Sequence, residues 1–147
     1  MALEEVRDPG NLGTIVRTAD AAGAAGVILA GTCCDPYSPE AVRATMGSIF
    51  AVPIVKLERR AFLDLVQRWP GDTVATLIDA REDFRRVAYQ APELLVMGGE
   101  GPGLSAEAAA ACRRSVRIPM AGNLDSLNLS IATALALYQI RGARLKV

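Results

Sequence analysis

Residues 94–105 read LLVMGGEGPGLS, and this stretch decides the expected fold. Its first four residues form an apolar run that is typical of a buried strand. Four glycines in the next six residues, 98–103, predict a loop whose backbone can approach a ligand closely. Ser105, followed by small residues at helical spacing, predicts the N-cap of a helix. The stretch therefore predicts a strand that leads through a glycine-rich loop into a helix.

The same alternation of strand and helix extends along the whole chain. Short apolar runs predict strands at residues 27–30, 53–57, 73–79, 94–97 and 115–118. Helical spacing and start signals predict helices at residues 10–26, 39–47, 59–69, 105–112 and 127–141. This order indicates an α/β fold with a mostly parallel sheet flanked by helices. No repeat or linker divides the chain, so residues 1–147 are expected to form one domain.

The composition excludes several classes of protein. The chain has 147 residues, 16 basic and 16 acidic side chains, and no histidine. A Ser-His-Asp triad and the histidine-containing zinc sites are therefore excluded, and zero net charge argues against a surface that coats nucleic acid. Three cysteines without CxxC spacing predict neither a disulfide framework nor a metal site, and they indicate a cytoplasmic protein. No apolar run approaches the roughly 20 residues of a membrane span, and the acidic N-terminal residues do not resemble a signal peptide.

The glycine-rich loop does not match the common phosphate-binding motifs. Its spacing differs from GxGxxG, it carries an acid at Glu100, and no GK[ST] sequence follows it. A tight connection between a strand and a helix explains the loop as well as a ligand site does. In an open parallel sheet, ligands bind beyond the carboxyl ends of the strands. Residues 98–103 and 119–125 are the two loops expected there.

The last helix and the segment before it have contrasting compositions. Apolar residues surround the axis of the helix over residues 127–141, which predicts burial on all sides. Either a partner subunit, most simply in a two-fold dimer, or the core of one subunit would cover it. Four polar residues precede or begin this helix: Asn123, Asp125, Ser126 and Asn128. Capping explains one of them, for which Ser126 or Asp125 is expected.

The first helix combines polar residues with small ones. Asn11 and Arg17 are six residues apart, so they lie broadly on one side of the helix. Gly13 and several alanines and threonines around them permit close packing. Arg17 is either a solvated surface charge or a positioned hydrogen-bond donor.

Three segments of the chain together resemble the motifs of the SpoU (TrmH-like) family. They are residues 8–19 (DPGNLGTIVRTA), residues 95–105 (LVMGGEGPGLS) and residues 118–130 (IPMAGNLDSLNLS). This family belongs to the SPOUT class of RNA methyltransferases, which use S-adenosylmethionine. The resemblance covers nearly the whole chain, and within the family it is closest to the ribosomal-RNA ribose 2′-O-methyltransferases. Many members carry a separate N-terminal RNA-binding domain, which is absent here, so we expect the catalytic domain.

The resemblance implies a fold, a cofactor and a set of site residues. The fold would be an α/β domain with a C-terminal trefoil knot, whose loops hold S-adenosylmethionine without a metal, and the subunits would form homodimers. The implied active-site positions are Asn11, Arg17, Glu100, Ser126 and Asn128. The implied cofactor contacts are Thr76, Gly98, Gly99, Gly103, Ile118, Met120 and Leu127.

The residues are consistent with transfer to a ribose hydroxyl. Without histidine, Arg17 and Glu100 are the candidates for assisting proton loss, but an arginine has too high a pKa to act as a base. We therefore expect Arg17 to stabilise the developing alkoxide and to hold a neighbouring phosphate, while Glu100 orients the backbone or Asn11.

Other functions and substrates stay open at this point. The chain could methylate transfer RNA or a base, form a non-catalytic RNA-binding dimer on the same fold, or bind a nucleotide at the glycine loop as a different α/β enzyme. Several groups of cations either reach RNA phosphates or form solvated faces. These are Arg59-Arg60, Arg85-Arg86, Arg113-Arg114 with Arg117, and Arg141, Arg144 and Lys146.

Overall fold

Seven strands form a parallel sheet in the computed structural model, which describes residues 1–145. The strands are β1 (Ala2–Glu4), β2 (Val27–Ala30), β3 (Ile54–Leu57), β4 (Thr73–Thr76), β5 (Glu82–Asp83), β6 (Leu94–Gly98) and β7 (Arg114–Arg117). Their order is β3-β2-β1-β6-β4-β7-β5, and every neighbouring pair is parallel. The predicted α/β class with a parallel sheet is confirmed. Lys146, one of the cations noted in the sequence, lies outside the described residues.

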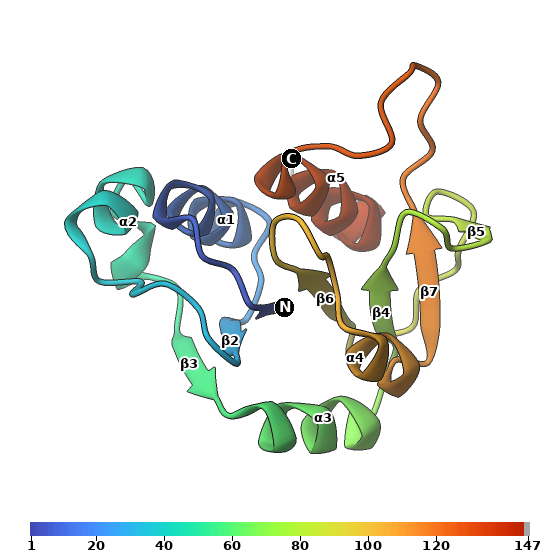
Figure 1. Ribbon diagram of the computed structural model, residues 1–147, viewed down its shortest axis with the longest axis horizontal. Helices are drawn as coiled ribbons and strands as arrows, with labels where there is room; N and C mark the ends of the chain where they lie inside the picture. The colour runs from blue at the N-terminus through green and yellow to red at the C-terminus, as the bar shows by residue number, and fades with distance from the viewer. Residues whose placement is uncertain (146–147) are drawn as a thin grey trace.

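Helices cover both faces of this sheet (Figure 1). They are α1 (Pro9–Ala21), α2 (Pro39–Ala44), α3 (Arg59–Arg68), α4 (Ala106–Ala111) and α5 (Leu129–Arg141), with 3-10 helices η1 (Ser48–Phe50) and η2 (Gly142–Arg144). α1 packs between α2 and α5 on one face, while α3 and α4 pack together on the other. Ser105 caps α4 with its side chain, as the sequence predicts, and Ser38 caps α2 in the same way.

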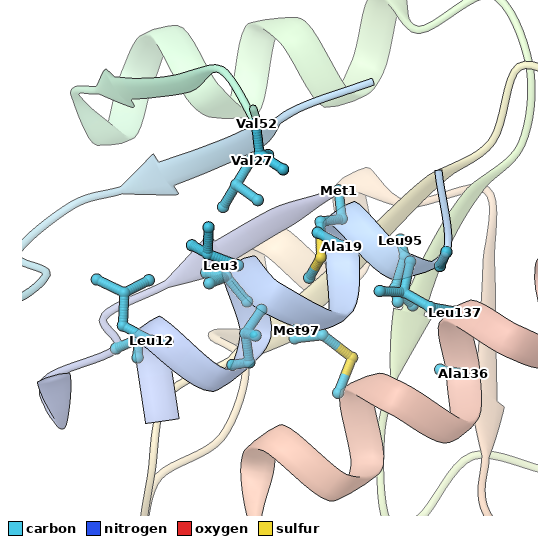
Figure 2. Close-up of a cluster of buried hydrophobic side chains, with 14 of the residues drawn as sticks. Met1, Leu3, Leu12, Ala19, Val27, Val52, Leu95, Met97, Ala136 and Leu137 are labelled. Carbon is cyan, nitrogen blue, oxygen red and sulfur yellow. The ribbon is translucent and has the colours of Figure 1, made fainter. Parts of the chain in front are cut away.

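Alternate residues of β6 divide the hydrophobic core between the two faces. Leu95 and Met97 pack into the cluster that includes α1 and α5, which Figure 2 shows. Leu94 and Val96 point the other way, into the cluster of α3 and α4. All four are buried, which explains why this strand reads as a continuous apolar run.

Two strands are missing from the sequence-based prediction. β1 has three residues and lies between β2 and β6, although its last residue, Glu4, is an acid. β5 consists only of Glu82 and Asp83 at the edge of the sheet. Such short strands with charged residues have no apolar periodicity, so only tertiary pairing reveals them.

The predicted ends of the first two helices are wrong. α1 ends at Ala21 instead of near residue 26, because Gly23 adopts a left-handed φ of +65° in the turn that follows. α2 ends at Ala44 instead of residue 47, because Met46 and Gly47 have φ values of +51° and +96°. In both places a residue with left-handed backbone conformation ends the helix earlier than predicted.

The strand predicted over residues 73–79 is too long at its C-terminal end. β4 ends at Thr76, and the Leu77 N–H makes one more hydrogen bond, to the Val116 carbonyl. Ile78 is exposed beyond that point. The β-branched residues suggested a longer strand, but the partner strand supports no further pairing here.

The predicted burial of α5 on all sides is wrong for the single chain. Ala136, Leu137 and Ile140 face α1 and the sheet and are buried. Leu135 and Tyr138, on the opposite side, are 43% and 47% exposed. α5 is an outer layer of the domain, so the described residues cover only one of its faces. A core helix enclosed by the described residues is therefore excluded, whereas a partner subunit stays a prediction.

The three cysteines are half-buried and unpaired, as expected for packed thiols. Burial raises the pKa of Cys33, Cys34 and Cys112, the last to about 12. The thiols are therefore protonated and weakly nucleophilic near neutral pH.

In residues 1–145, no group of three potential metal-binding side chains could hold an ion. None of the helices described there is long and apolar enough to cross a membrane.

Candidate active site

Segments from three parts of the chain meet at the carboxyl edge of the central strands. The register pairs Glu4, the last residue of β1, with Gly98, the last residue of β6. Because parallel strands end at the same edge, the glycine-rich loop at 99–103 and the start of α1 at Pro9 both lie there. β7 joins the same parallel sheet through β4, so the following segment, residues 118–128, leaves from this edge as well.

One side chain from each segment enters a continuous chain of hydrogen bonds. Asn11 on α1 donates through Nδ2 to Glu100 Oε1 in the glycine-rich loop, at 3.0 Å. Asn128 donates through Nδ2 to Asn11 Oδ1, also at 3.0 Å. Residues separated by 89 and 117 positions in the sequence therefore hold one another in place.

Contacts with the backbone fix Glu100, at one end of this hydrogen-bond chain, and Asn11, at its middle. Glu100 Oε2 accepts from the Arg7 N–H at 3.3 Å. Asp8 caps α1, and its Oδ1 accepts from the Asn11 N–H at 2.6 Å. The amide of Asn11 thus donates on one side and accepts on the other, which sets its orientation. Glu100 makes the contact that its expected orienting role requires.

Asn128 caps α5, so the expectation that Ser126 or Asp125 does so is wrong. Asn128 Oδ1 accepts from the N–H groups of Ser130 at 2.9 Å and Ile131 at 3.4 Å. The same oxygen accepts from Ser130 Oγ at 2.6 Å. The helix begins at Leu129, two residues later than predicted, because the chain turns only after Leu127.

Arg17 and Ser126 are not part of this hydrogen-bond chain. Arg17 lies six residues, less than two turns, beyond Asn11 on α1. It is exposed and has no ion pair with another residue in the described range. Ser126 is exposed in the segment before α5. A guanidinium that forms no internal ion pair is available to an external anion.

The glycines of the loop are required mainly by the chain itself. A Cβ at Gly98 would lie 1.9 Å from the Leu104 nitrogen, and one at Gly99 would lie 2.2 Å from the Glu5 carbonyl oxygen. Gly99 also pairs with Gly103, which closes the loop. Larger residues at 98 or 99 would therefore displace the loop itself, whatever ligand it binds. Gly103 differs, since its φ of +72° favours glycine, whereas a Cβ there would meet no atom of the described residues within 4 Å.

Glu4 supports the far end of the loop, and sequence reasoning did not identify it. Its side chain is only 2% exposed, and its two oxygens accept from the Ser105 N–H and Oγ, both at 2.8 Å. Arg59 donates to the same carboxylate at 3.4 Å and pairs with Glu107. An acid next to the start of a chain gives no sequence signal for burial, because its partners are 55 and 101 residues away.

The edge also offers groups that fit a bound nucleoside. The Thr76 Oγ1 at the end of β4 is buried and has no hydrogen-bond partner in the described structure. Ile118 is half-buried, and Met120 and Leu127 are partly exposed beyond β7. Small-molecule sites combine such polar groups, which orient a ligand, with apolar side chains, which bury it. Thr76, Ile118, Met120 and Leu127 thus supply polar and apolar groups of the kinds that a nucleoside ligand requires, whereas their role toward S-adenosylmethionine stays a prediction from the family resemblance.

Comparison with known proteins gives a consistent result. The model of the SpoU rRNA Methylase family matches residues 1–138. The 23S rRNA (guanosine-2′-O-)-methyltransferase RlmB of Haemophilus influenzae is 36% identical over 147 residues, covering 99% of this chain and 60% of its own. The 23S rRNA (guanosine(2553)-2′-O)-methyltransferase RlmP of Bacillus subtilis is 30% identical over 142 residues, covering 97% of this chain and 57% of its own.

A solved structure is similar as well. The crystal structure of an AdoMet-bound rRNA methyltransferase from Sinorhizobium meliloti has a TM-score of 0.94 and 50% sequence identity. The match covers 99% of this chain and 56% of that one. The chain therefore spans between half and two thirds of the length of these proteins.

Proposed function

The chain belongs to the SpoU rRNA Methylase family, and from this premise we propose that it is the catalytic domain of a ribosomal-RNA methyltransferase. The reaction would transfer a methyl group from S-adenosylmethionine to a ribose 2′-hydroxyl. The hydrogen-bond chain Glu100–Asn11–Asn128 carries this proposal, because it joins all three family motifs at one sheet edge. The 23S rRNA relatives favour ribosomal over transfer RNA as the substrate. Such a substrate and three unpaired thiols fit a cytoplasmic location.

We assign the methyl donor to the carboxyl edge of β4, β6 and β7. When bound, S-adenosylmethionine supplies a methyl group that its sulfonium has already activated. Thr76, with its unmatched hydroxyl, would donate to or accept from the ligand, and apolar side chains would cover it. The contacting residues are proposed to be Thr76, Gly98, Gly99, Gly103, Ile118, Met120 and Leu127.

The protein's own residues position the ribose and assist proton loss. Arg17 stabilises the alkoxide that develops at the 2′-oxygen and binds an adjacent phosphate, which can take up the proton. Ser126 and Asn128 orient the hydroxyl, while Glu100 and Asn11 hold Asn128 in register. This division of roles requires no histidine.

The knot and the homodimer expected from the family remain part of the proposal. Two features of the sheet support a knot, in which α5 would pass through a loop. β6 and β7 insert on either side of β4, and the long segment at 118–128 then leads back to α1. The uncovered apolar side of α5 supports a two-fold partner.

The replacement of Arg17 tests the catalytic proposal. We expect Arg17→Gln to lower methyl transfer to ribosomal RNA by at least about 100-fold, the usual effect of removing one transition-state donor. Donor affinity should not change, because Arg17 is not assigned to the cofactor. Methyl transfer is measured with labelled S-adenosylmethionine, followed by identification of the 2′-O-methylnucleosides. Donor affinity is measured by calorimetric titration with S-adenosylmethionine.

Arg43→Gln is the matched control, because Arg43 is an exposed arginine on α2 outside the site. It should leave both measurements unchanged. Full activity of Arg17→Gln would refute the role of Arg17. A wild-type chain that binds no donor would refute the methyltransferase assignment, and label in transfer RNA alone would refute the choice of substrate.

A further inference from the structure

Arginines gather at the edge of the sheet formed by β5 and β7. Two depressions there, of about 480 and 680 Å³, share Arg81, Glu82 and Arg114 in their linings. The larger one is also lined by Arg86 and Arg117. We call the surface around the larger depression the arginine groove, and define it by Arg81, Arg86, Arg114 and Arg117.

Internal ion pairs divide the arginines of this edge into two groups. Arg114 lies 3.4 Å from Asp72 and 3.7 Å from Glu82, and Arg85 lies 2.6 Å from Asp83. These pairs neutralise the carboxylates Glu82 and Asp83 that line the groove. Arg81, Arg86 and Arg117 are exposed and form no ion pair within residues 1–145. The groove therefore presents three cations that can bind an external anion.

The groove lies where the segment that leads to the candidate active site leaves the sheet. Arg117 is the last residue of β7, and Ile118 and Pro119 begin the segment that leads to Asn128. Figure 1 shows β5 and β7 side by side at one edge of the sheet, below this segment. In the sheet, β4 separates β7 from β6, whose loop carries Glu100. Two strand spacings amount to roughly 10 Å, a span that an RNA chain of a few nucleotides covers.

We propose that the arginine groove binds backbone phosphates of the RNA substrate, beside the nucleotide that is methylated. This inference rests on the proposed function and adds a binding surface to it. The guanidinium fork matches a phosphate with paired hydrogen bonds. Three unpaired arginines spread around an open depression suit successive phosphates better than one small anion. Among the described residues, no aromatic side chain lines the groove, so it contacts the RNA backbone and leaves base recognition to other parts of the protein.

The proposal separates the arginine clusters of the sequence into two kinds. Arg85 and Arg86 are neighbours in the sequence, but only Arg86 lines the groove, while Arg85 pairs with Asp83. Zero net charge of the whole chain does not oppose RNA binding, because counterions are released locally where unpaired cations meet phosphates.

RNA titration of a triple variant tests the groove. The variant combines Arg81→Gln, Arg86→Gln and Arg117→Gln. Its affinity for a mixed-sequence, single-stranded RNA oligonucleotide is compared with that of wild type, with binding monitored by fluorescence anisotropy at several salt concentrations. We expect the affinity to fall by about tenfold or more at low salt. The slope of log affinity against log salt should decrease in magnitude by about 2, because each lost phosphate contact contributes about 0.7.

The matched control removes three arginines elsewhere: Arg43→Gln, Arg60→Gln and Arg68→Gln, on α2 and α3. These side chains are exposed and have no ion pair in the described part of the chain. The control should bind RNA with the wild-type affinity and slope. Equal losses in both variants, or none in the groove variant, would overturn the proposal. Displacement of the RNA by millimolar inorganic phosphate at constant ionic strength would also overturn it, since that marks a site for a small anion.

Donor titration of the same samples distinguishes this proposal from the proposed function. The groove variant should bind S-adenosylmethionine like wild type, because no assigned cofactor residue lines the groove in the described structure. If the wild-type chain binds no donor but the groove variant loses RNA affinity, the methyltransferase function is refuted and the groove proposal stands. If the wild-type chain binds the donor but the groove variant keeps its RNA affinity, only the groove proposal is refuted.

Discussion

Asn128 performs two tasks with one side chain. Its Oδ1 accepts from the first N–H groups of α5, which would otherwise lack partners. Its Nδ2 donates to Asn11 and so connects the helix to the hydrogen-bond chain of the candidate site. The position of α5 and the order of the site therefore depend on the same amide group.

Two substitutions of Asn128 separate these tasks. Asn128→Ala removes the cap and should lower the free energy of unfolding by about 1 kcal/mol. Asn128→Asp keeps an oxygen that can cap the helix but cannot donate to Asn11, so it should unfold near the wild-type denaturant concentration. Both variants should lose most methyl transfer, because both break the link to Asn11. Urea unfolding and the labelled-methyl assay provide the two measurements, and equal destabilisation by Ala and Asp would contradict the capping role.

Sequence patterns reveal some caps but not this one. Ser105 is the one suitable residue directly before its helix, and the prediction that it caps α4 is confirmed. Before α5, Asp125, Ser126 and Asn128 all have suitable oxygens, and the choice depends on where the chain turns back to α1. Glu4 was missed for a related reason, since its burial is set by partners far away in the sequence.

At the scale of elements, Gly13 allows α1 and α2 to approach closely. A Cβ on Gly13 would lie 2.4 Å from the Ala41 carbonyl oxygen and 2.5 Å from the Ala44 Cβ. Small residues on the first helix were expected to permit close packing, and this contact confirms it. The helix start that carries Asn11 is held against α2 by this packing.

Gly13→Ala should destabilise the protein, although alanine is the better helix former. The propensity gain of about 1 kcal/mol is outweighed by overpacking against α2, which typically costs about 1–3 kcal/mol and here also requires backbone displacement. Thr14→Ala, at an exposed position of the same helix, is the control and should be neutral or slightly stabilising. Thermal unfolding followed by circular dichroism compares them, and a Gly13→Ala variant as stable as Thr14→Ala would contradict the close packing.

The elements were predictable where one local signal dominates. β2 and β6 are apolar runs buried on both faces, and both were predicted within one residue of their ends. β1 and β5 were missed, because two or three residues carry no period and acids end both strands. The approach of the loops to one edge follows from the parallel sheet, whereas the hydrogen bonds between them required the structure.

At the scale of the whole molecule, the domain leaves one helix face uncovered. Ile131, Leu135 and Tyr138 follow one another at helical spacing along α5, and each is about half exposed. Their predicted burial is wrong for the single chain, but the pattern that suggested it is real. A second copy related by a two-fold axis would bury this face against its own equivalent.

Leu135→Asp tests the proposed homodimer. A charge at the centre of an apolar interface should weaken the dimer by at least about 2 kcal/mol, or about 30-fold in dissociation constant. The side chain is exposed in the single chain, so the domain should still fold, which circular dichroism can verify. Ile78→Asp replaces another exposed apolar residue, away from α5, and should leave the association unchanged. Sedimentation velocity over a concentration series should thus show a dimer for wild type and Ile78→Asp and a monomer for Leu135→Asp. A monomeric wild type or a dimeric Leu135→Asp variant would contradict an interface on α5.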